Sequence, residues 1–328
     1  MSGTTLAEKI RLSVIVPVYN LEAYLPATLD SLLGIRAGGP FEIIAVDDGS
    51  QDGSLGILRE YEAKDGRIRV ITGENGGVLR ARNKGIDAAR GSWLFFSDGD
   101  DTVEPDFFAA AIDDAEREGY DLVQGNIRYL EANGRVLKVL PGSEYIPGGR
   151  LETRDAEELA ELFFGRTETL MFSACAKLFR RELVGETRFP EGVRVAEDQK
   201  FVFDLLQKDP KVLILDTDAY NYIMWPTSVM HTGYVEKGWD AVRILEGYEE
   251  TVESPRILRH IAKRKTDIYV RIYNTATVTG KDPGKALQAV RETDVRVIRA
   301  DLTKKEWIKL VLLQHCRPLY NILLKVVG

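Results

Sequence analysis

Short apolar runs alternate with amphipathic segments in the first third of the chain. The predicted strands cover residues 12–19, 41–46, 68–72 and 93–97, and the predicted helices cover residues 25–33, 54–61 and 78–89. Alternating strands and helices indicate βαβ units, in which successive strands run parallel within one sheet. The pattern therefore predicts an α/β fold with a mostly parallel central sheet flanked by helices.

The remainder of the chain is less regular and becomes helical. After a helix that follows Pro105, strands are predicted at residues 121–126, 136–140 and 212–215, and helices around residues 156–164 and 198–207. From about Val235 the pattern is helical, with a breaker at Asp282-Pro283-Gly284. We therefore expect an α/β domain over residues 10–232 and a helical C-terminal region over residues 233–328.

Composition narrows the classes of protein. The formal net charge of -7 argues against a nucleic-acid-binding protein, which is usually basic. Two cysteines, Cys175 and Cys316, give neither a disulfide framework nor a cysteine-rich zinc site. Residues 1–11 lack the apolar core of a signal peptide, and no apolar run is long enough to span a bilayer. We expect a cytoplasmic protein, and peripheral contact with the inner face of the membrane stays open.

Polar residues follow three predicted strands at their carboxyl ends. They are Pro17–Asn20, Asp47-Asp48 and Asp98–Asp101. In open parallel sheets, ligands bind outside the carboxyl ends of the strands, so the three clusters should meet at one edge. Carboxylate oxygens suit Mg²⁺ or Mn²⁺, which often share their coordination with phosphates. The plain alternative is an acidic turn, since Asp-Gly is a common turn pair.

Two common nucleotide-binding motifs are absent. No Gly-x-Gly-x-x-Gly follows the first predicted strand, and no Gly-x-x-x-x-Gly-Lys-Ser/Thr run occurs in the chain. A dinucleotide oxidoreductase and a P-loop NTPase are therefore poor interpretations.

The motifs that are present resemble the family-2 inverting glycosyltransferases of the GT-A fold, of the bacterial polysaccharide and cell-wall type. In chain order they are SVIVPVYN (13–20), VDDGSQDGS (46–54), ENGGVLRARNKG (74–85), FSDGDD (96–101) and AEDQ (196–199). The resemblance is strong over residues 12–110, moderate to about 232 and slight beyond. It implies a Rossmann-like GT-A domain that binds a nucleotide-sugar.

The resemblance implies a donor site. Its nucleotide-binding residues would be Pro17, Val18, Tyr19, Asn20, Glu22, Asp48, Asn75, Gly76, Arg82, Asp98, Gly99 and Asp100. Asp48 would accept a hydrogen bond from uracil, and the Arg82 guanidinium would grip phosphate or sugar oxygens. Simpler interpretations are that Pro17 ends an edge strand, and that Asp48 forms a turn with Gly49.

The resemblance also implies a divalent metal, Mn²⁺ or Mg²⁺. Asp98 and Asp100 form the Asp-x-Asp motif, in which Asp98 would contact ribose or metal and Asp100 would coordinate the metal through the diphosphate. His231 falls where related enzymes carry a loop that closes on the diphosphate, so it is a further candidate ligand. A structural or solvated histidine is the simpler interpretation of His231.

Asp198 is the candidate general base, which would take the proton of the acceptor hydroxyl. Two acids at a helix start, Glu197 and Asp198, would also favour the helix dipole without any catalytic role. Lys177 matches a segment that lies near the acceptor cleft in the family. A surface cation is the alternative for Lys177.

The C-terminal segment 304–327 combines apolar and basic residues at helical spacing, and Pro318 should break it. It fits a basic amphipathic membrane-surface pair of helices. It also fits packing onto the catalytic domain or onto a second subunit, which would make a homo-oligomer.

The sequence thus predicts a metal-dependent, inverting hexosyl- or N-acetylhexosaminyl-transferase. The donor would be a UDP-sugar, and the acceptor a hydroxyl of a cell-surface glycan or a lipid-linked saccharide. The alternatives are a transferase that uses a dTDP- or GDP-sugar, and a non-catalytic nucleotide-sugar-binding scaffold.

Overall fold

The computed structural model describes residues 9–165, 169–191, 196–225 and 234–327. The described residues form two compact units. The α/β unit contains residues 9–156, 169–191 and 197–225, and the helical unit contains residues 157–165, 196 and 234–327. Among the described residues, the chain therefore contributes 157–165 and residue 196 to the helical unit before its C-terminal part.

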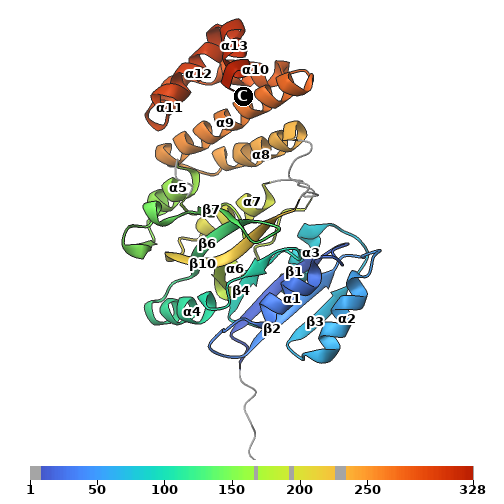
Figure 1. The fold of residues 1–328 in the computed structure, drawn as a ribbon. Helices are drawn as coiled ribbons and strands as arrows, with labels where there is room; N and C mark the ends of the chain where they lie inside the picture. Colours follow the sequence, from blue (N-terminus) through green and yellow to red (C-terminus); the bar gives the residue numbers. More distant parts are fainter. Residues whose placement is uncertain (1–8, 166–168, 192–195, 226–233, 328) are drawn as a thin grey trace, which may run out of the picture. The chain divides into compact units, whose positions relative to one another are not determined.

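The α/β unit is built on one sheet (Figure 1). Its described strands are β1 (Leu12–Val18), β2 (Phe41–Asp47), β3 (Ile68–Thr72), β4 (Trp93–Phe96), β5 (Thr102–Val103), β6 (Leu122–Glu131), β7 (Val136–Leu140), β8 (Arg150–Thr153), β9 (Lys177–Arg180) and β10 (Val212–Met224). The order is β3-β2-β1-β4-β9-β6-β10-β5, with β7 beside β6 and β8 beside β10. Strands β1 to β4 pair in parallel, β10 runs parallel to β6, and β9 is antiparallel to both β4 and β6.

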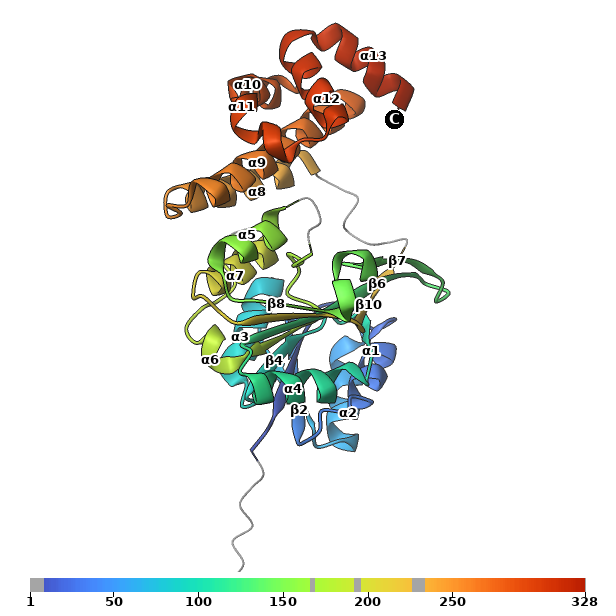
Figure 2. The same ribbon diagram turned by 90° about the vertical axis from the view of Figure 1, so that its left-hand side faces the viewer.

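Helices cover both faces of this sheet. They are α1 (Leu25–Leu33), α2 (Ser54–Lys64), α3 (Val78–Ala88), α4 (Phe107–Glu118), α6 (Arg181–Val184) and α7 (Glu197–Leu206). In Figure 2, α4 and α7 lie on opposite faces. Successive side chains of a strand point to opposite faces of the sheet. Neighbouring apolar residues of β4 therefore place side chains on both faces, and helices must cover both. Phe95 packs edge-on against Phe108 of α4, and Phe96 packs against Phe201 of α7.

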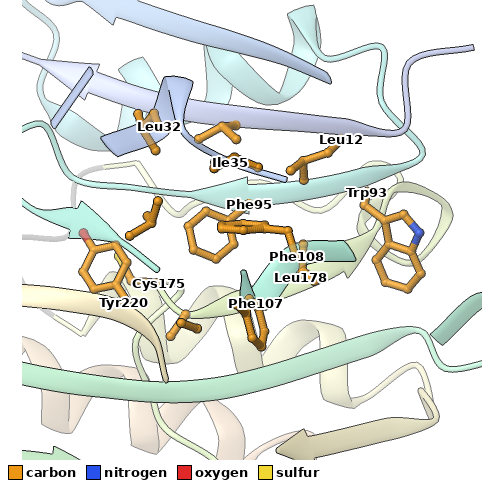
Figure 3. Close-up of a cluster of buried hydrophobic side chains, with 14 of the residues drawn as sticks. Leu12, Leu32, Ile35, Trp93, Phe95, Phe107, Phe108, Cys175, Leu178 and Tyr220 are labelled. Carbon is orange, nitrogen blue, oxygen red and sulfur yellow. The ribbon is translucent and has the colours of Figure 1, made fainter. Parts of the chain in front are cut away.

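A buried hydrophobic cluster lies between the sheet and the helices of one face. Figure 3 shows Phe95, Phe107 and Phe108 gathered in this cluster with aliphatic side chains such as Leu32 and Leu178. Tyr220 of β10 lies in the same cluster and is 1% exposed. Because its phenol is polar, its burial requires hydrogen-bond partners, which the acidic turn after β4 supplies.

The helical unit consists of α5 (Ala156–Phe164), α8 (Tyr234–Glu249), α9 (Pro255–Thr279), α10 (Gly284–Glu292), α11 (Val295–Ile298), the 3₁₀ turn η4 (Arg299–Asp301), α12 (Lys304–His315) and α13 (Arg317–Val327). Helix α9 packs against α8, α10 and α11, and α12 packs against α10 and α13. The Ser254 side chain caps α9 at its start, and Gly280, with φ of 72°, ends it in the left-handed conformation. None of the described helices combines the length and the apolar character that a membrane span needs.

The predicted α/β class, with a mostly parallel central sheet and a helical C-terminal region, is confirmed. The break expected at Pro318 lies at Cys316, between α12 and α13. The antiparallel strands β5, β8 and β9 were not predicted. Strand β9 has four residues and two of them are basic, so it carries no apolar run.

Helix α3 lies close to β1 because Gly85 has no side chain. A Cβ at this position would overlap the side chain of Ile15. We expect Gly85→Ala to lower the free energy of unfolding by about 1–3 kcal/mol, the usual cost of overpacking a core, measured by urea denaturation. The matched control is Gly56→Ala in α2, where a Cβ meets nothing within 4 Å. That change should stabilise the fold by roughly 0.5–1 kcal/mol, and equal effects at the two positions would contradict this account.

Candidate active site

The parallel strands β1, β2 and β4 end at one edge of the sheet. Val18 pairs with Asp47, and Ile15 pairs with Phe96. The loops 19–24, 48–53 and 97–101 follow these ends, so the structure brings the three polar clusters to the same edge.

Strand β1 ends with Pro17 and Val18, which are buried, and Tyr19 is 43% exposed. Because β1 lies between β2 and β4, the interpretation that Pro17 ends an edge strand is wrong. Of these three side chains, the ring of Tyr19 is the one that is open to a ligand.

Asn20 and Glu22 hold the loop after β1 against the loop after β2. The Asn20 carboxamide oxygen accepts a hydrogen bond from the backbone N–H of Gln51 at 2.7 Å, and the Glu22 carboxylate accepts one from Gly53 at 2.5 Å. Asn20 has a φ of 53°, a left-handed conformation that asparagine tolerates better than most residues. The two side chains therefore shape the edge of the site through the backbone.

Asp48 is 2% exposed and joins the loop after β2 to the loop that precedes α3. Its carboxylate oxygens accept hydrogen bonds from the backbone N–H groups of Gly76 at 2.9 Å and Gly77 at 2.6 Å. Gly49 has a φ of 75°, and a Cβ on it would lie 2.9 Å from the backbone nitrogen of Asn75. Each carboxylate oxygen has a second lone pair, so Asp48 can still accept a hydrogen bond from a ligand.

Arg82, on α3, joins the acidic turn after β4 to the start of α7. Its Nη2 donates to Asp98 Oδ1 at 2.7 Å, and its Nη1 donates to Asp198 Oδ1 at 2.7 Å. The residue is 4% exposed. Burial opposes its charge, but the charges of Asp198 and Asp98 outweigh burial and raise the pKa of Arg82 above its usual value. One guanidinium thus binds the candidate metal-binding and base carboxylates together and offsets part of their negative charge.

Aromatic packing fixes the position of Arg82. Its guanidinium lies 5.2 Å from the centre of the Phe189 ring, which stacks on Phe201 of α7 at 4.1 Å. The neighbouring Asn83 holds the backbone of Phe189 with two hydrogen bonds, one to its carbonyl oxygen at 3.0 Å and one from its N–H at 2.8 Å. These contacts connect α3 to α7, and so they set the distance between Arg82 and Asp198.

Asp198 lies in the first turn of α7, and its side chain is 21% exposed. Its second oxygen, Oδ2, accepts a hydrogen bond from the backbone N–H of Ala174 at 2.9 Å. The carboxylate is therefore oriented from two sides while part of it still faces solvent. Burial, together with the charge of Asp198, raises the pKa of the neighbouring Glu197.

The turn 98–101 is fastened to β10 by Asp101. The Asp98 backbone N–H donates to the Tyr220 hydroxyl at 2.9 Å, which donates to Asp101 Oδ2 at 2.8 Å. Asp101 Oδ1 accepts from the backbone N–H of Ile223 at 2.8 Å. Gly99 is buried beneath the turn, where a Cβ would lie 2.7 Å from the Leu21 side chain. Asp101 therefore supports the turn, and Asp98 and Asp100 are left for a ligand.

Asp98 and Asp100 fit a divalent cation. Burial and the charge of Asp98 raise the pKa of Asp100 to about 6, and burial with both neighbouring charges raises the pKa of Asp101 further. This accumulation of negative charge would be relieved by a cation beside Asp100. Within the described ranges, no three His, Cys, Asp or Glu side chains are gathered as a metal cage. Mg²⁺ in phosphate sites is commonly held by one or two carboxylates, so the pair meets the usual requirement.

His231, the third candidate ligand, lies outside the described residues. The last described residue before it, Trp225, donates from Nε1 to the carbonyl oxygen of Asp100 at 3.1 Å. Its ring lies 4.4 Å from that of Tyr24. The chain thus runs directly past the acidic turn as it approaches residue 226.

Lys177 is not a surface cation, and that alternative is wrong. It is fully buried in β9, and its Nζ donates to the backbone carbonyl of Ser173 at 2.6 Å. The sequence analysis did not identify Tyr220 and Phe189 as residues that support the site. Tyr220 and Tyr222, on either side of the polar Asn221, were a signal for the longer β10, but Phe189 follows no pattern that indicates its role.

Comparisons of sequence identify the family. Residues 13–188 match the family model described as glycosyl transferase family 2. The chain is 36% identical over 224 residues to the uncharacterized glycosyltransferase EpsJ of Bacillus subtilis, a match that covers 68% of this chain and 63% of EpsJ. It is 28% identical over 232 residues to the poly(ribitol-phosphate) beta-glucosyltransferase of Bacillus spizizenii, covering 69% of this chain and 34% of the relative. Each match thus spans less than two thirds of the relative's length.

Comparisons of structure agree on the fold. The S. aureus TarS fragment 1–349 in complex with UDP-GlcNAc is similar with a TM-score of 0.70 and 21% identity, over 93% of this chain and 87% of that one. The mannosyltransferase PcManGT of Pyrobaculum calidifontis, in complex with GDP-Man and Mn²⁺, is similar with a TM-score of 0.56 and 16% identity, over 94% of this chain and 88% of that one. With the family model covering more than half of its residues, the chain belongs to glycosyl transferase family 2, and its α/β unit has the GT-A fold.

Proposed function

We propose that this chain transfers a hexosyl or N-acetylhexosaminyl group from a UDP-sugar to a hydroxyl group of a cell-surface glycan or a lipid-linked saccharide, with inversion at the anomeric carbon. The observation that carries the proposal is the buried Arg82, whose two Nη atoms bind Asp98 and Asp198. This bridge puts the carboxylate of the Asp-x-Asp motif and the candidate base on one guanidinium, at the edge of the sheet where such folds bind ligands.

The donor would occupy the loops at this edge. Tyr19 offers an exposed ring to the base, and Asp48 offers acceptor lone pairs beside the Gly76 and Gly77 amides. Pro17, Val18, Asn20, Glu22 and Asn75 would line the same donor site. Asp48 can accept a hydrogen bond from the imide N–H of uracil, which thymine also has, and the N1–H of guanine is a donor of the same kind. A dTDP-sugar and a GDP-sugar are therefore the alternative donors, and the similar PcManGT is in complex with GDP-Man.

Asp198 is the proposed general base. In this mechanism it takes the proton of the acceptor hydroxyl as the hydroxyl oxygen attacks the anomeric carbon. The new glycosidic bond forms as the bond to the diphosphate breaks, and UDP leaves from the opposite side, which inverts the centre. The contacts from Arg82 and Ala174 orient the carboxylate, and each of its oxygens has another lone pair for the proton.

Asp98 and Asp100 would hold Mn²⁺ or Mg²⁺. When bound, such an ion supplies Lewis-acid stabilisation of the negative charge on the diphosphate. Asp101 and Tyr220 keep the two carboxylates in place by fastening their turn to β10.

A scaffold that binds a nucleotide-sugar without transfer is the alternative function. It predicts donor binding but no sugar transfer. The presence of both Asp100 and Asp198 argues against it, because a site that only binds the donor does not need a candidate base beside the candidate metal-binding carboxylates.

Asp198→Asn should slow transfer strongly, leave a small residual rate and spare donor binding. The amide keeps the size of the side chain but is a far weaker proton acceptor, so the transfer rate should fall roughly 10²–10⁴-fold. Sugar transfer and UDP affinity should be measured side by side. The matched control is Asp204→Asn on the same helix, whose carboxylate pairs with Lys200 and should not affect the rate. Full activity in Asp198→Asn would refute the base assignment.

Asp100→Asn should weaken donor binding in the presence of a divalent metal and leave metal-free donor binding unchanged. We expect the gain in melting temperature caused by UDP with Mn²⁺ to shrink in this variant, since ligand binding stabilises the folded state by mass action. The shift caused by UDP with EDTA should match that of the wild type. Asp106→Asn is the control, because Asp106 is exposed and pairs with Arg36 away from the site. An unchanged Mn²⁺-dependent shift would remove Asp100 from the metal site.

The C-terminal helices α12 and α13 are the proposed contact with an anionic lipid surface, as a lipid-linked acceptor requires. Ile308, Leu319 and Ile322 are exposed, and the segment 304–327 carries five basic residues against one acidic residue in a chain with net charge -7. Exposed aliphatic side chains among basic ones are typical of helices that lie on membranes.

The protein should sediment with vesicles that contain phosphatidylglycerol and stay in solution with neutral vesicles. Ile322→Glu should reduce the sedimented fraction, because it places a negative charge among the exposed apolar groups. Val278→Glu is the control, at an exposed valine in the last turn of α9. If light scattering showed self-association and the protein did not bind vesicles, a second copy of the chain would instead be favoured as the partner of α12 and α13.

A further inference from the structure

Lys177 is a fully buried lysine within the sheet. It lies in β9, which is paired with β4 on one side and β6 on the other. Burying an amine is costly, and lysine is among the residues least often buried completely. Burial lowers the pKa of Lys177 to about 7, although the charges of Cys175 and Asp198 oppose this shift. Both the charged and the neutral amine keep N–H donors, so the hydrogen bond that Lys177 makes does not depend on its proton count.

Lys177 and its neighbour on the adjacent strand both form hydrogen bonds to the irregular segment 169–173. Lys177 is the register partner of Gln124 in β6, which is also fully buried. The Gln124 side chain donates to the carbonyl of Thr169 at 2.8 Å and accepts from the N–H of Met171 at 2.8 Å. Lys177 donates to the carbonyl of Ser173 at 2.6 Å. Two buried polar side chains on adjacent strands are thus used to fix the backbone of residues 169–173.

The peptide group between Ser173 and Ala174 connects Lys177 to Asp198. Its carbonyl oxygen accepts from Lys177 Nζ, and its N–H donates to Asp198 Oδ2 at 2.9 Å. A peptide group is planar, and in the trans form its C=O and N–H point in opposite directions. Fixing the carbonyl therefore fixes the direction of the N–H. A donor on the carbonyl also polarises the amide and strengthens the hydrogen bond that its N–H makes.

We propose that Lys177 is a positioning residue for Asp198, which it orients through the Ser173–Ala174 peptide group. The proposal rests on the proposed function, in which Asp198 is the base. Lys177 itself is 0% exposed, so its amine touches neither donor nor acceptor. Arg82 holds Oδ1 of the base, and the Ala174 amide holds Oδ2, so loss of Lys177 should free one side of the carboxylate.

The first test is Lys177→Met, which keeps most of the apolar stem and removes the donor. We expect the turnover number to fall on the order of 10²-fold, as misplacement of a catalytic group by about 1 Å does, while UDP affinity is unchanged. Lys211→Met is the matched control. Lys211 Nζ also donates to a backbone carbonyl, that of Glu118 at 2.9 Å, but it precedes β10 and makes no contact with Asp198 among the described residues. Its turnover number should equal that of the wild type.

A double-mutant cycle separates positioning from a general loss of structure. In the Asp198→Asn background, Lys177→Met should cause no further loss of the residual transfer rate, because its effect passes through Asp198. If the rate of the double variant instead fell by the product of the two single-variant factors, the proposal would be overturned. If Lys177→Met fails to fold, Lys177→Gln, whose side chain is one bond shorter, takes its place in the cycle with the same expected non-additivity.

The NMR resonance of the Ala174 amide gives a readout that does not need activity. It would be observed in protein labelled with ¹⁵N-alanine and assigned through Ala174→Gly. Lys177→Met should move this resonance, and Lys211→Met should not. An unmoved Ala174 resonance would overturn the proposal whatever the rates. If the wild type transfers no sugar from any donor, the proposed function fails, and a moved Ala174 resonance would still establish the link from Lys177 to the backbone amide that binds Asp198.

Discussion

The bridge from Asp98 through Arg82 to Asp198 is the interaction on which the rest of the candidate site depends. A buried guanidinium left without any carboxylate partner would be an uncompensated charge, which typically costs about 3–5 kcal/mol. The three residues come from α3, the turn after β4 and the start of α7, so the ion pairs exist only when these elements are packed together. The stability of the fold and the assembly of the site are therefore coupled.

Backbone N–H groups form hydrogen bonds to several of the carboxylates around this bridge. Asp48 holds the amides of Gly76 and Gly77, Glu22 holds that of Gly53, and the Ala174 amide holds Asp198. Backbone donors lose little conformational entropy when they bind, because the fold has already fixed them. Loops without regular structure are thereby given defined positions at the edge of the sheet. Such order before the ligand arrives is what a transferase needs to align donor and acceptor.

The two units have different physical characters. The α/β unit buries its polar and charged groups in networks, as with Tyr220 and Asp101. The helical unit presents exposed aliphatic residues, such as Ile308 and Ile322, next to basic ones on α12 and α13. The first arrangement favours one rigid geometry, whereas the second favours contact with an extended surface. This division agrees with a family model that matches the α/β part of the chain and ends at residue 188.

The sequence by itself determined the α/β class and the edge where the polar loops meet, because apolar periodicity and residue order along parallel strands are local properties. Its resemblance to a family also named Asp98, Asp100 and Asp198 as candidate site residues, which stay predictions. Only the tertiary structure decided that Arg82 joins two of these carboxylates, and that Lys177 is buried rather than exposed. The contact between Arg82 and Asp198 joins residues 116 positions apart, and the burial of Lys177 depends on strand β9, whose four residues carry no periodic signal. Side-chain partners and burial are set by packing between elements, which no local pattern records.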